Sequence, residues 1–585
     1  MLSYRKLAMR VLGRPLHTGG GIDSPRPASQ RAAALVLTAA MLTTFTAPAF
    51  AKTWYIEDGD ITISASETKG TNKVSQGAEP EVEDTGTIIT NREKDASSHT
   101  VTINAGNDKV EVTLDNVNIK ADSGSALISK GDVTLTLKGD NHLTGGNGGS
   151  SSYGGDGITS SGSLTISGGT VTATGGDSTS SVGSGGSGIY SVSGDVTISG
   201  GTVNANGGDG KNGSGGGSGI DSSGGVTVSG GTVTANGGDS KDGDGGSGGY
   251  GISSSGVSIS GGTVTANGGD GGSGSGSHGG IGIYSSGGVT ISSGSTVTAN
   301  GGDGEDGSGG RGITSNGGVT VSGGTVNAKG GSGKNGNGGD GIRSFNPVAI
   351  SGGTVNANGG NSDYSNGGDG IRSLDHVAIS GGTVKSNGGS GNLSGGNGII
   401  SYDIDLSGSL ELTAKAGSPN GKALSRVGSE LDLNTIKDKL DPGAKVTATD
   451  ADGKVIPQVS IPRPVEPEEP SSSSDSGSAT PSAPASFLPG LTVTDKDGQR
   501  ISYTSTQSGN TLTVRVGRFT ASLRASLSTL RQLRAEGIDT ITFQTILCST
   551  TLSVDELLTM GGEDTEVVLT HHIRSSTLTV GGKAV

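Results

Sequence analysis

One stretch of the chain decides the fold: Gly219-Ile220-Asp-Ser-Ser-Gly-Gly-Val226-Thr-Val228-Ser-Gly-Gly-Thr-Val233-Thr-Ala235-Asn236-Gly-Gly-Asp239. Its apolar residues alternate with Thr, Ser or Asn, so the apolar side chains of each short segment share one face. Three such segments follow one another closely and are joined by Gly-rich turns. The spacing is too short for antiparallel hairpins of useful length. It fits one coil of a parallel β-helix, in which each segment pairs with its equivalent in the next coil.

The same pattern returns along the chain, and the dipeptide Gly-Ile marks each return at intervals of 28 to 32 residues. The marking isoleucines are Ile158, Ile189, Ile220, Ile252, Ile283, Ile313, Ile342, Ile371 and Ile399. Three short faces and their turns need roughly twenty residues, so the remainder of each repeat forms a Gly-rich loop at one corner. The sequence therefore predicts an all-β fold, a right-handed parallel β-helix with about 30 residues per coil.

Composition excludes the common alternatives. Of 585 residues 115 are Gly, whereas 29% are hydrophobic and 3% aromatic. A helical bundle or an ordinary enzyme domain is disfavoured, because Gly weakens helix and strand interiors. Collagen is excluded because no strict Gly-X-Y period occurs and Pro numbers only 16. A thin, repetitive β architecture remains.

The ends of the chain differ from the repeats. Residues 1–51 combine a basic start, an apolar run and Ala49-Phe50-Ala51, the order of a secretory signal peptide. Thr and Pro interrupt the apolar run, which is too short for a membrane anchor. We therefore expect an extracellular or cell-surface protein, with no membrane insertion after signal removal. The single Cys548 allows no internal disulfide.

Four segments are predicted. Residues 1–51 are the signal peptide, and residues 52–456 are the β-helix with its leading coils and a C-terminal cap. Residues 457–486 form a Pro/Ser-rich linker, and residues 487–585 form a small α+β module with helices near 526–536 and 554–560. In the leading coils, the step from Ala126 to Val133 is aligned with the step from Ile189 to Val196. An apolar set is expected to cover the last coil: Leu431, Leu433, Ile436 and Leu440.

Acidic residues recur at one loop position, in the string Asn-Gly-Gly-Asp. They are Asp177, Asp209, Asp239, Asp270 and Asp303. Stacked in register, these like charges would repel one another, and Ca²⁺ is the natural ion to offset them. Loops held by hydrogen bonds to neighbouring coils, or solvated loops screened by salt, are the alternatives. Removal of residues 1–51 changes the formal net charge from −15 to −20, which disfavours nucleic acid as a partner.

Two further polar patterns occur. A column of Asn, which includes Asn206 and Asn236, predicts a stacked amide ladder or positive φ. Two consecutive coils carry Asp340 with Arg343 and Asp369 with Arg372. Paired Asp and Arg on adjacent coils suit an acidic or hydroxylated sugar, bound through bidentate hydrogen bonds. A solvated ladder of ion pairs is the other interpretation.

The sequence offers little support for a catalytic function. General acid–base chemistry needs two differently tuned groups in one pocket, whereas this sequence repeats one loop many times. Asn-Thr-Asp, Asp-Asp and Arg-Ile-Lys, the signatures of β-helix pectate lyases and polygalacturonases, are absent. His571-His572 lacks an evident third metal ligand. We expect no enzyme activity.

A family resemblance rests on Thr53-Trp54-Tyr55-Ile56, on Val112-Thr-Leu-Asp-Asn-Val-Asn-Ile119 and on the Ser-Gly-Gly-Thr-Val-Thr-Ala repeats. The chain resembles the exported β-helical carbohydrate-binding domain-containing proteins of gut and cellulolytic Firmicutes over roughly residues 53–415. That resemblance implies binding of plant polysaccharide, bound Ca²⁺ and no cleavage. The long Gly-rich loop of each coil departs from that pattern.

These observations together favour a secreted or cell-surface β-solenoid that binds a plant or host polysaccharide, with calcium-assisted loops. A structural adhesin or spacer that displays the C-terminal module is the alternative. A degenerate polysaccharide lyase is the third hypothesis.

Overall fold

The computed structural model describes residues 51–149, 153–181, 183–241, 245–456 and 458–461, and residues 491–584 with short gaps. Those gaps are 496–499, 502, 509, 517–519, 546–548, 563–564 and 572–575. The chain divides into two compact units between residues 465 and 466. The signal-peptide prediction and most of the linker prediction lie outside the described residues. No helix of the described segments has the length and apolarity needed to cross a bilayer.

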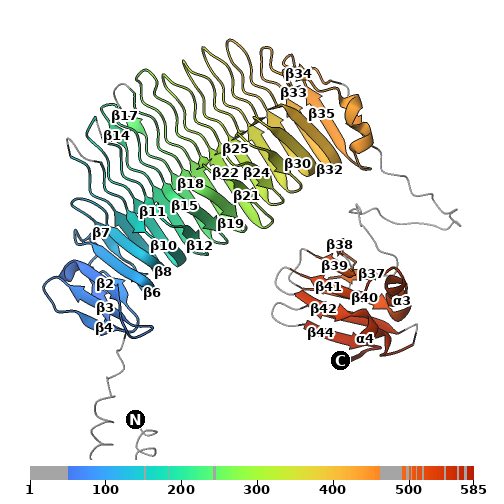
Figure 1. The fold of residues 1–585 in the computed structure, drawn as a ribbon, viewed down its shortest axis with the longest axis horizontal. Helices are drawn as coiled ribbons and strands as arrows, with labels where there is room; N and C mark the ends of the chain where they lie inside the picture. Colours follow the sequence, from blue (N-terminus) through green and yellow to red (C-terminus); the bar gives the residue numbers. More distant parts are fainter. Residues whose placement is uncertain are drawn as a thin grey trace, which may run out of the picture. The chain divides into compact units, whose positions relative to one another are not determined.

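The first unit is a parallel β-helix of about 13 turns, which confirms the predicted fold (Figure 1). The strands that open each turn pair with one another along the solenoid. They are β2 (Ile61–Ala65), β6 (Val101–Asp115), β8 (Leu127–Thr144), β9 (Ile158–Ser161), β11 (Ile189–Ser193), β15 (Ile220–Val228), β18 (Ile252–Ile259), β20 (Ile283–Ser285), β23 (Ile313–Ser315), β26 (Ile342–Ser344), β29 (Ile371–Ser373), β31 (Ile399–Ser401) and β33 (Leu424–Arg426).

Two more strand positions complete each turn. Several long strands span two neighbouring positions. The second position is occupied by β10 (Leu164–Thr174), β12 (Val196–Ile198), β21 (Val289–Ile291), β24 (Val319–Val321), β27 (Val348–Ile350), β30 (His376–Asn387) and β32 (Asp403–Lys415). The third is occupied by β13 (Thr202–Asn206), β16 (Thr232–Asn236), β19 (Gly262–Asn267), β22 (Ser295–Asn300), β25 (Thr325–Lys329), β28 (Thr354–Asn358) and β35 (Lys445–Thr449).

The coils stack in register. Ile220 pairs with Ile252, and Val233 pairs with Val264. The alignment of Ala126 with Ile189 is wrong by one residue. Leu127 pairs with Ile158, which pairs with Ile189, and a register shift follows between Ser191 and Ser193. That shift adds one residue between the first and second strands of the coil that begins at Ile189. An alignment that matches Val133 with Val196 therefore places Ile189 opposite Ala126 instead of Leu127.

The core is a stack of five inward-facing columns, one side chain of each column per coil. In one coil these are Ile220, Val226, Val228, Val233 and Ala235, all at most 1% exposed. Two polar features close the turns between the strands. The buried serine of β20, Ser285, donates its hydroxyl hydrogen to the carbonyl of Gly288 at 3.1 Å. The second glycine of Ser-Gly-Gly turns has positive φ, as at Gly231 with φ 80°, where a Cβ would be strained.

Both ends of the solenoid are covered. At the front is an antiparallel extension in which β2 pairs with β3 (Asn72–Gln76) and β3 with β4 (Val82–Asp84). Trp54 of β1 (Thr53–Tyr55) is 3% exposed there and donates from Nε1 to Asp84 Oδ2 at 2.8 Å. At the rear, the 3-10 helix η2 (Leu433–Lys439) places Leu433 and Ile436 in the core cluster, together with Leu431 and Leu440.

The minor elements of this unit are short. They are η1 (Ile56–Asp58), β5 (Ile88–Thr90), β7 (Asn118–Lys120), β14 (Gly210–Lys211), β17 (Ser240–Lys241), β34 (Ser429–Glu430) and β36 (Val459–Ser460).

The Gly-rich loops are ordered by backbone hydrogen bonds and glycine packing. Each loop has an outgoing arm and a return arm, which lie beside those of the neighbouring coils (Figure 1). Gly217 donates across the loop to the Gly208 carbonyl at 2.8 Å, and Gly238 of the next coil donates to Gly217 at 2.8 Å. A Cβ on Gly237 would lie 2.1 Å from the Gly249 oxygen, and one on Gly238 would lie 2.0 Å from the Gly208 oxygen. Two consecutive positions in each arm therefore admit only glycine. Hydrogen bonding between coils, one of the alternatives left open for these loops, is present.

The second unit contains two sheets and two short helices. One sheet has the order β37-β40-β43-β44-β45 and the other β38-β39-β41-β42. The elements are β37 (Leu491–Thr494), β38 (Thr504–Ser508), β39 (Thr511–Arg515), β40 (Ala521–Ser526), α3 (Leu527–Ala535), β41 (Thr540–Gln544), β42 (Ser549–Ser553), α4 (Val554–Leu558), β43 (Glu566–His571), β44 (Ser576–Val580) and β45 (Lys583–Ala584). Both expected helices are present. Ser526 and Ser553 immediately precede them, and the side chains of these serines cap the first turns.

Candidate functional site: a groove between the glycine arms and the first strands

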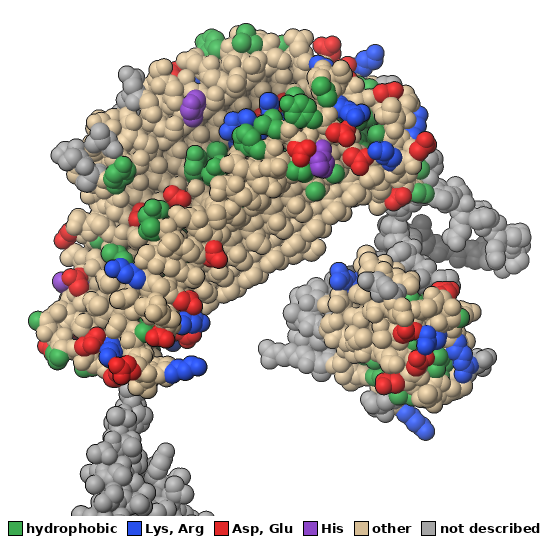
Figure 2. All heavy atoms as spheres, viewed as in Figure 1, with side chains coloured by type: hydrophobic (Ala, Val, Ile, Leu, Met, Phe, Trp, Pro, Cys, Tyr) green, Lys and Arg blue, Asp and Glu red, His purple; other side chains and the backbone are tan. Residues whose placement is uncertain are grey.

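A groove lies where the return arms of the loops meet the first strands of the coils. It comprises two adjoining cavities of about 480 and 370 Å³, which share Ser308, Gly309 and Arg311 in their linings. One wall is glycine backbone, and the other carries the side chains that flank each Gly-Ile dipeptide. Figure 2 shows hydrophobic, basic and acidic side chains gathered together towards the rear of the solenoid. The groove crosses the strands, so it runs along the solenoid axis.

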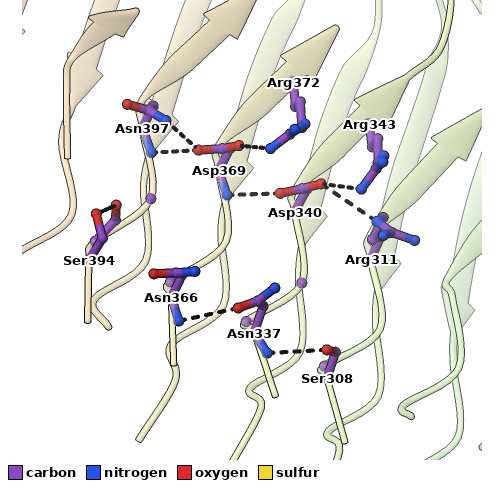
Figure 3. Close-up of a pocket in the computed structure, with 16 residues that line it drawn as sticks. Ser308, Arg311, Asn337, Asp340, Arg343, Asn366, Asp369, Arg372, Ser394 and Asn397 are labelled. Carbon is purple, nitrogen blue, oxygen red and sulfur yellow. Dashed lines mark hydrogen bonds and ion pairs between the residues drawn. The ribbon is translucent and has the colours of Figure 1, made fainter. Parts of the chain in front are cut away.

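Asp340 and Asp369 line the smaller of the two cavities (Figure 3). The backbone N–H of Asp369 donates to Asp340 Oδ1 at 2.9 Å. Asn397 repeats that contact one coil further on, donating to Asp369 Oδ1 from its backbone at 2.6 Å and from Nδ2 at 2.8 Å. One oxygen of each carboxylate is therefore used in coil-to-coil stacking, and the other faces the arginines.

Three arginines lie over these carboxylates. Arg372 Nη1 is 3.1 Å from Asp369 Oδ2, and Arg343 Nη1 is 3.7 Å from Asp340 Oδ2. Arg311, one coil earlier, approaches Asp340 Oδ2 to 3.5 Å from Nε. The Asp340 and Asp369 side chains are 9% and 6% exposed, so these ion pairs are buried on the acidic side. They do not form the fully solvated ladder that was the other interpretation of these residues.

Burial shifts the pKa values of two groups in this cluster. Burial raises the pKa of Asp369, and the nearby charge of Asp340 adds to that shift. Burial also lowers the pKa of Arg343, with Arg311 adding to the effect. Three guanidinium groups face two carboxylates here, although the whole chain has a formal net charge of −15. The Nε atoms of Arg343 and Arg372 are buried and have no hydrogen-bond partner among the described residues.

The larger cavity of the groove is lined in part by aromatic side chains. Tyr250 lines it, and the Tyr284 ring lies against the Tyr250 ring with centroids 5.6 Å apart. His278 comes from the arm side, where its Nδ1 accepts the backbone N–H of Ser308 at 2.9 Å. Burial raises the pKa of Tyr250, so its hydroxyl stays protonated at neutral pH.

Sequence reasoning selected Asp340, Arg343, Asp369 and Arg372, and the structure brings these four together. It missed Tyr250, Tyr284, Arg311 and Asn397, although they occupy the same two repeat positions, directly before and directly after Gly-Ile. Comparison of those two positions down all the coils would have found them.

The acidic ladder is also a coil-to-coil contact. Asp209 donates its backbone N–H to Asp177 Oδ1 at 3.0 Å, and Asp239 donates to Asp209 Oδ1 at 3.0 Å. Asp270 and Asp303 continue the series at 2.9 and 2.7 Å. Lys241 also pairs with Asp209. Backbone donors and one lysine therefore offset part of the repulsion for which Ca²⁺ was invoked. Burial raises the pKa of Asp270.

Two other polar patterns are structural contacts in the described residues. Asn236 donates from Nδ2 to Asn206 Oδ1 at 2.8 Å, so a stacked amide ladder is present. His571 is 0% exposed, and its ring nitrogens lie 3.2 Å from Thr545 Oγ1 and 2.9 Å from Thr550 Oγ1. His572 lies outside the described residues. Across the described segments, no three His, Cys, Asp or Glu side chains are grouped so as to hold a metal ion.

Comparison with known proteins supports the same class of fold. The family model described as Beta helix repeat matches residues 164–188, 196–218, 257–281 and 348–371. These segments lie in the solenoid, and the match supports a β-helical protein. No curated protein and no solved structure matches the chain.

Proposed function

We propose that this protein is an exported, cell-surface β-solenoid that binds polysaccharide in the groove and does not cleave it. The observation that carries the proposal is the continuous groove, in which a tyrosine pair leads into a row of arginines on consecutive coils. Coils repeat about every 4.8 Å, a distance comparable to one sugar unit of an extended polymer. A polysaccharide along the axis would then meet equivalent positions coil after coil.

The chemistry of the walls suits sugars that carry acidic groups. Arginine pairs well with planar carboxylates through two parallel hydrogen bonds, and the Arg343 and Arg372 side chains are partly exposed. The Tyr250 and Tyr284 rings offer an apolar surface with a polar edge, which suits a sugar ring. The backbone of the glycine arms adds polar groups that hydroxyls can contact.

The proposal that the groove binds polysaccharide without cleaving it rests on the contacts that its carboxylates already make. Asp340 and Asp369 each use one oxygen for a backbone N–H and the other for an arginine. A general acid or base must reach the reacting group directly, and these two lie beneath the arginines.

A glycan array probed with the full chain tests this proposal. We expect binding of uronate-containing polysaccharides, and loss of that binding in Arg343→Gln/Arg372→Gln. Tyr364→Ala is a matched control, because Tyr364 is 62% exposed outside the groove. Absence of binding to every glycan on the array would favour the alternative, a spacer or adhesin that displays the C-terminal module. Release of unsaturated uronides would favour the degenerate lyase.

Calcium assistance remains part of the proposal and has its own test. An ion that binds only the folded chain raises the melting midpoint as its concentration rises. A midpoint unmoved by millimolar Ca²⁺ or by chelator would remove calcium from the proposal. Export is tested separately, by the N-terminal sequence of the protein recovered outside the cell, which we expect to begin after Ala51.

A further inference from the structure

A second recess lies near the rear of the solenoid, at the corner that follows each first strand. In earlier coils this corner holds mainly small polar residues, such as Ser223, Ser255 and Ser286. In the last four coils it holds larger apolar side chains instead. These are Phe345, Leu374, Tyr402 and Val427. Phe345 is 45% exposed, Tyr402 66% and Val427 70%. Leu374 is half-buried. Apolar side chains on four consecutive coils, three of them exposed, form an uncommon surface, and such patches usually mark binding sites.

The apolar corner includes a defined cavity of about 260 Å³. Leu374, Ile400, Tyr402 and Val427 supply its apolar lining, and Arg372 is the charged residue that lines it. Binding cavities are mostly apolar with a few polar groups that orient the ligand. This cavity has that composition, and its volume suits a single aromatic ring with a short substituent.

Arg372 can orient a ligand in this cavity. Its Nη1 contacts Asp369 Oδ2 at 3.1 Å, and its side chain is 37% exposed. Its Nε has no partner among the described residues. Asp369 is itself held from the next coil by Asn397, so the guanidinium is anchored on one side. A partly exposed guanidinium attracts a carboxylate.

The other charged side chains near the cavity pair with one another and do not line it. Arg426 Nε pairs with Asp403 Oδ1 at 2.9 Å, and His376 Nδ1 lies 3.4 Å from Asp375 Oδ1. These groups line a separate cavity on the adjoining face, which Tyr402 borders. Arg372 is therefore the cation that meets the apolar cavity.

From this arrangement we propose that the corner cavity binds a small aromatic carboxylate, with its ring against Leu374, Tyr402 and Val427 and its carboxylate on Arg372. This site is additional to the polysaccharide groove, and Arg372 lines both. An aromatic ring fits because Tyr402 offers a ring face or edge for stacking. The inference does not depend on what the groove binds.

Titration calorimetry of the full chain with sodium cinnamate tests the proposal. We expect saturable binding of cinnamate, at least tenfold weaker binding of cinnamyl alcohol, and no binding of cinnamylamine. Tyr402→Ala and Arg372→Gln should each weaken cinnamate at least tenfold. Tyr402 is exposed, so its truncation should leave the fold intact, and far-ultraviolet circular dichroism checks this.

Tyr364→Ala is the matched control and should bind cinnamate like the unmodified chain. Absence of cinnamate binding would overturn the proposal. So would unchanged affinity in Tyr402→Ala. Equal affinity for cinnamate and cinnamyl alcohol would show an apolar cleft without an anion site, which also contradicts it.

Discussion

At the scale of single residues, glycine determines how closely the loop arms pack. In each arm one glycine faces the opposite arm, and the next faces the arm of the preceding coil. Because both positions touch backbone, the arms need no apolar side chains to stay ordered. Their backbone hydrogen bonds satisfy the N–H groups that such packing buries.

Gly238→Ala should therefore lower stability by about 1–3 kcal/mol, the usual cost of overpacking. A Cβ at this position would lie 2.0 Å from the Gly208 carbonyl oxygen. Gly200→Ala is the matched control, because nothing lies within 4 Å of its Cβ position, and it should change stability by less than about 0.5 kcal/mol. Thermal melts of the two variants measure the difference. Equal melting midpoints would contradict the packing argument.

The buried carboxylate of Asp369 should make binding of an anionic glycan depend on pH. Its pKa is raised by burial and by Asp340, so the carboxyl takes up a proton at a higher pH than an ordinary Asp. As pH falls through this raised pKa, Asp369 becomes neutral and the site gains net positive charge. Affinity for a sulfated glycan, which stays ionised, should rise on acidification. Asp369→Asn should bind with little pH dependence, and a persistent slope in that variant would contradict the assignment.

The raised pKa of Asp369 also determines how its contribution to folding stability changes with pH. A carboxyl whose folded-state pKa is raised contributes stability below its unfolded pKa, and loses that contribution as pH rises through the folded value. Burial shifts the pKa values of Asp156 and Asp221 in this direction too. These groups therefore do not weaken the solenoid on mild acidification.

At the scale of elements, the cap η2 protects the open end of the core. Leu433 and Ile436 are 5% and 3% exposed and belong to the solenoid core cluster. An uncovered last coil would present unpaired strand edges and apolar columns, and such edges promote aggregation.

Replacement of the buried cap residues should expose that end. We expect Leu433→Asp/Ile436→Asp to lose on the order of 3 kcal/mol or more, and to form larger species in size-exclusion chromatography. Thr435→Asp, on the exposed side of the same helix, should stay monodisperse. A double variant that elutes like the unmodified chain would show that the cap is dispensable.

At the scale of the whole solenoid, each coil contacts mainly its two neighbours. Stability in such an array is close to a sum of repeat and interface contributions. One complete coil can therefore be removed if the register of the remaining coils is kept.

Deletion of residues 158–188 removes one coil, from Ile158 to the glycine before Ile189, upstream of the residues that line the groove. We expect unchanged far-ultraviolet circular dichroism per residue and unchanged groove binding. Deletion of residues 189–203 removes half a coil and should lower the melting midpoint sharply, because it moves every later strand out of register. Similar melting midpoints for the two deletions would contradict the stacked architecture.

The sequence by itself determined the coil. Period-two alternation, turn glycines and the Gly-Ile spacing specify three strands and their register, because pairing of identical columns is the arrangement that buries all five at once. The sequence-based prediction was wrong at Ala126, because a register shift changes the number of residues between two strands of a later coil. It also missed the front hairpins, which do not follow the repeat.

Only the tertiary structure decided the site. Residues on either side of Gly-Ile share one wall because the return arm folds back against the first strand, and that approach depends on glycine packing between arms. Tyr250 and Tyr284 are 34 positions apart in the chain but in ring contact. Arg311, Arg343 and Arg372 likewise meet across successive coils. Distances of this kind follow from how the coils stack, and no single repeat contains them.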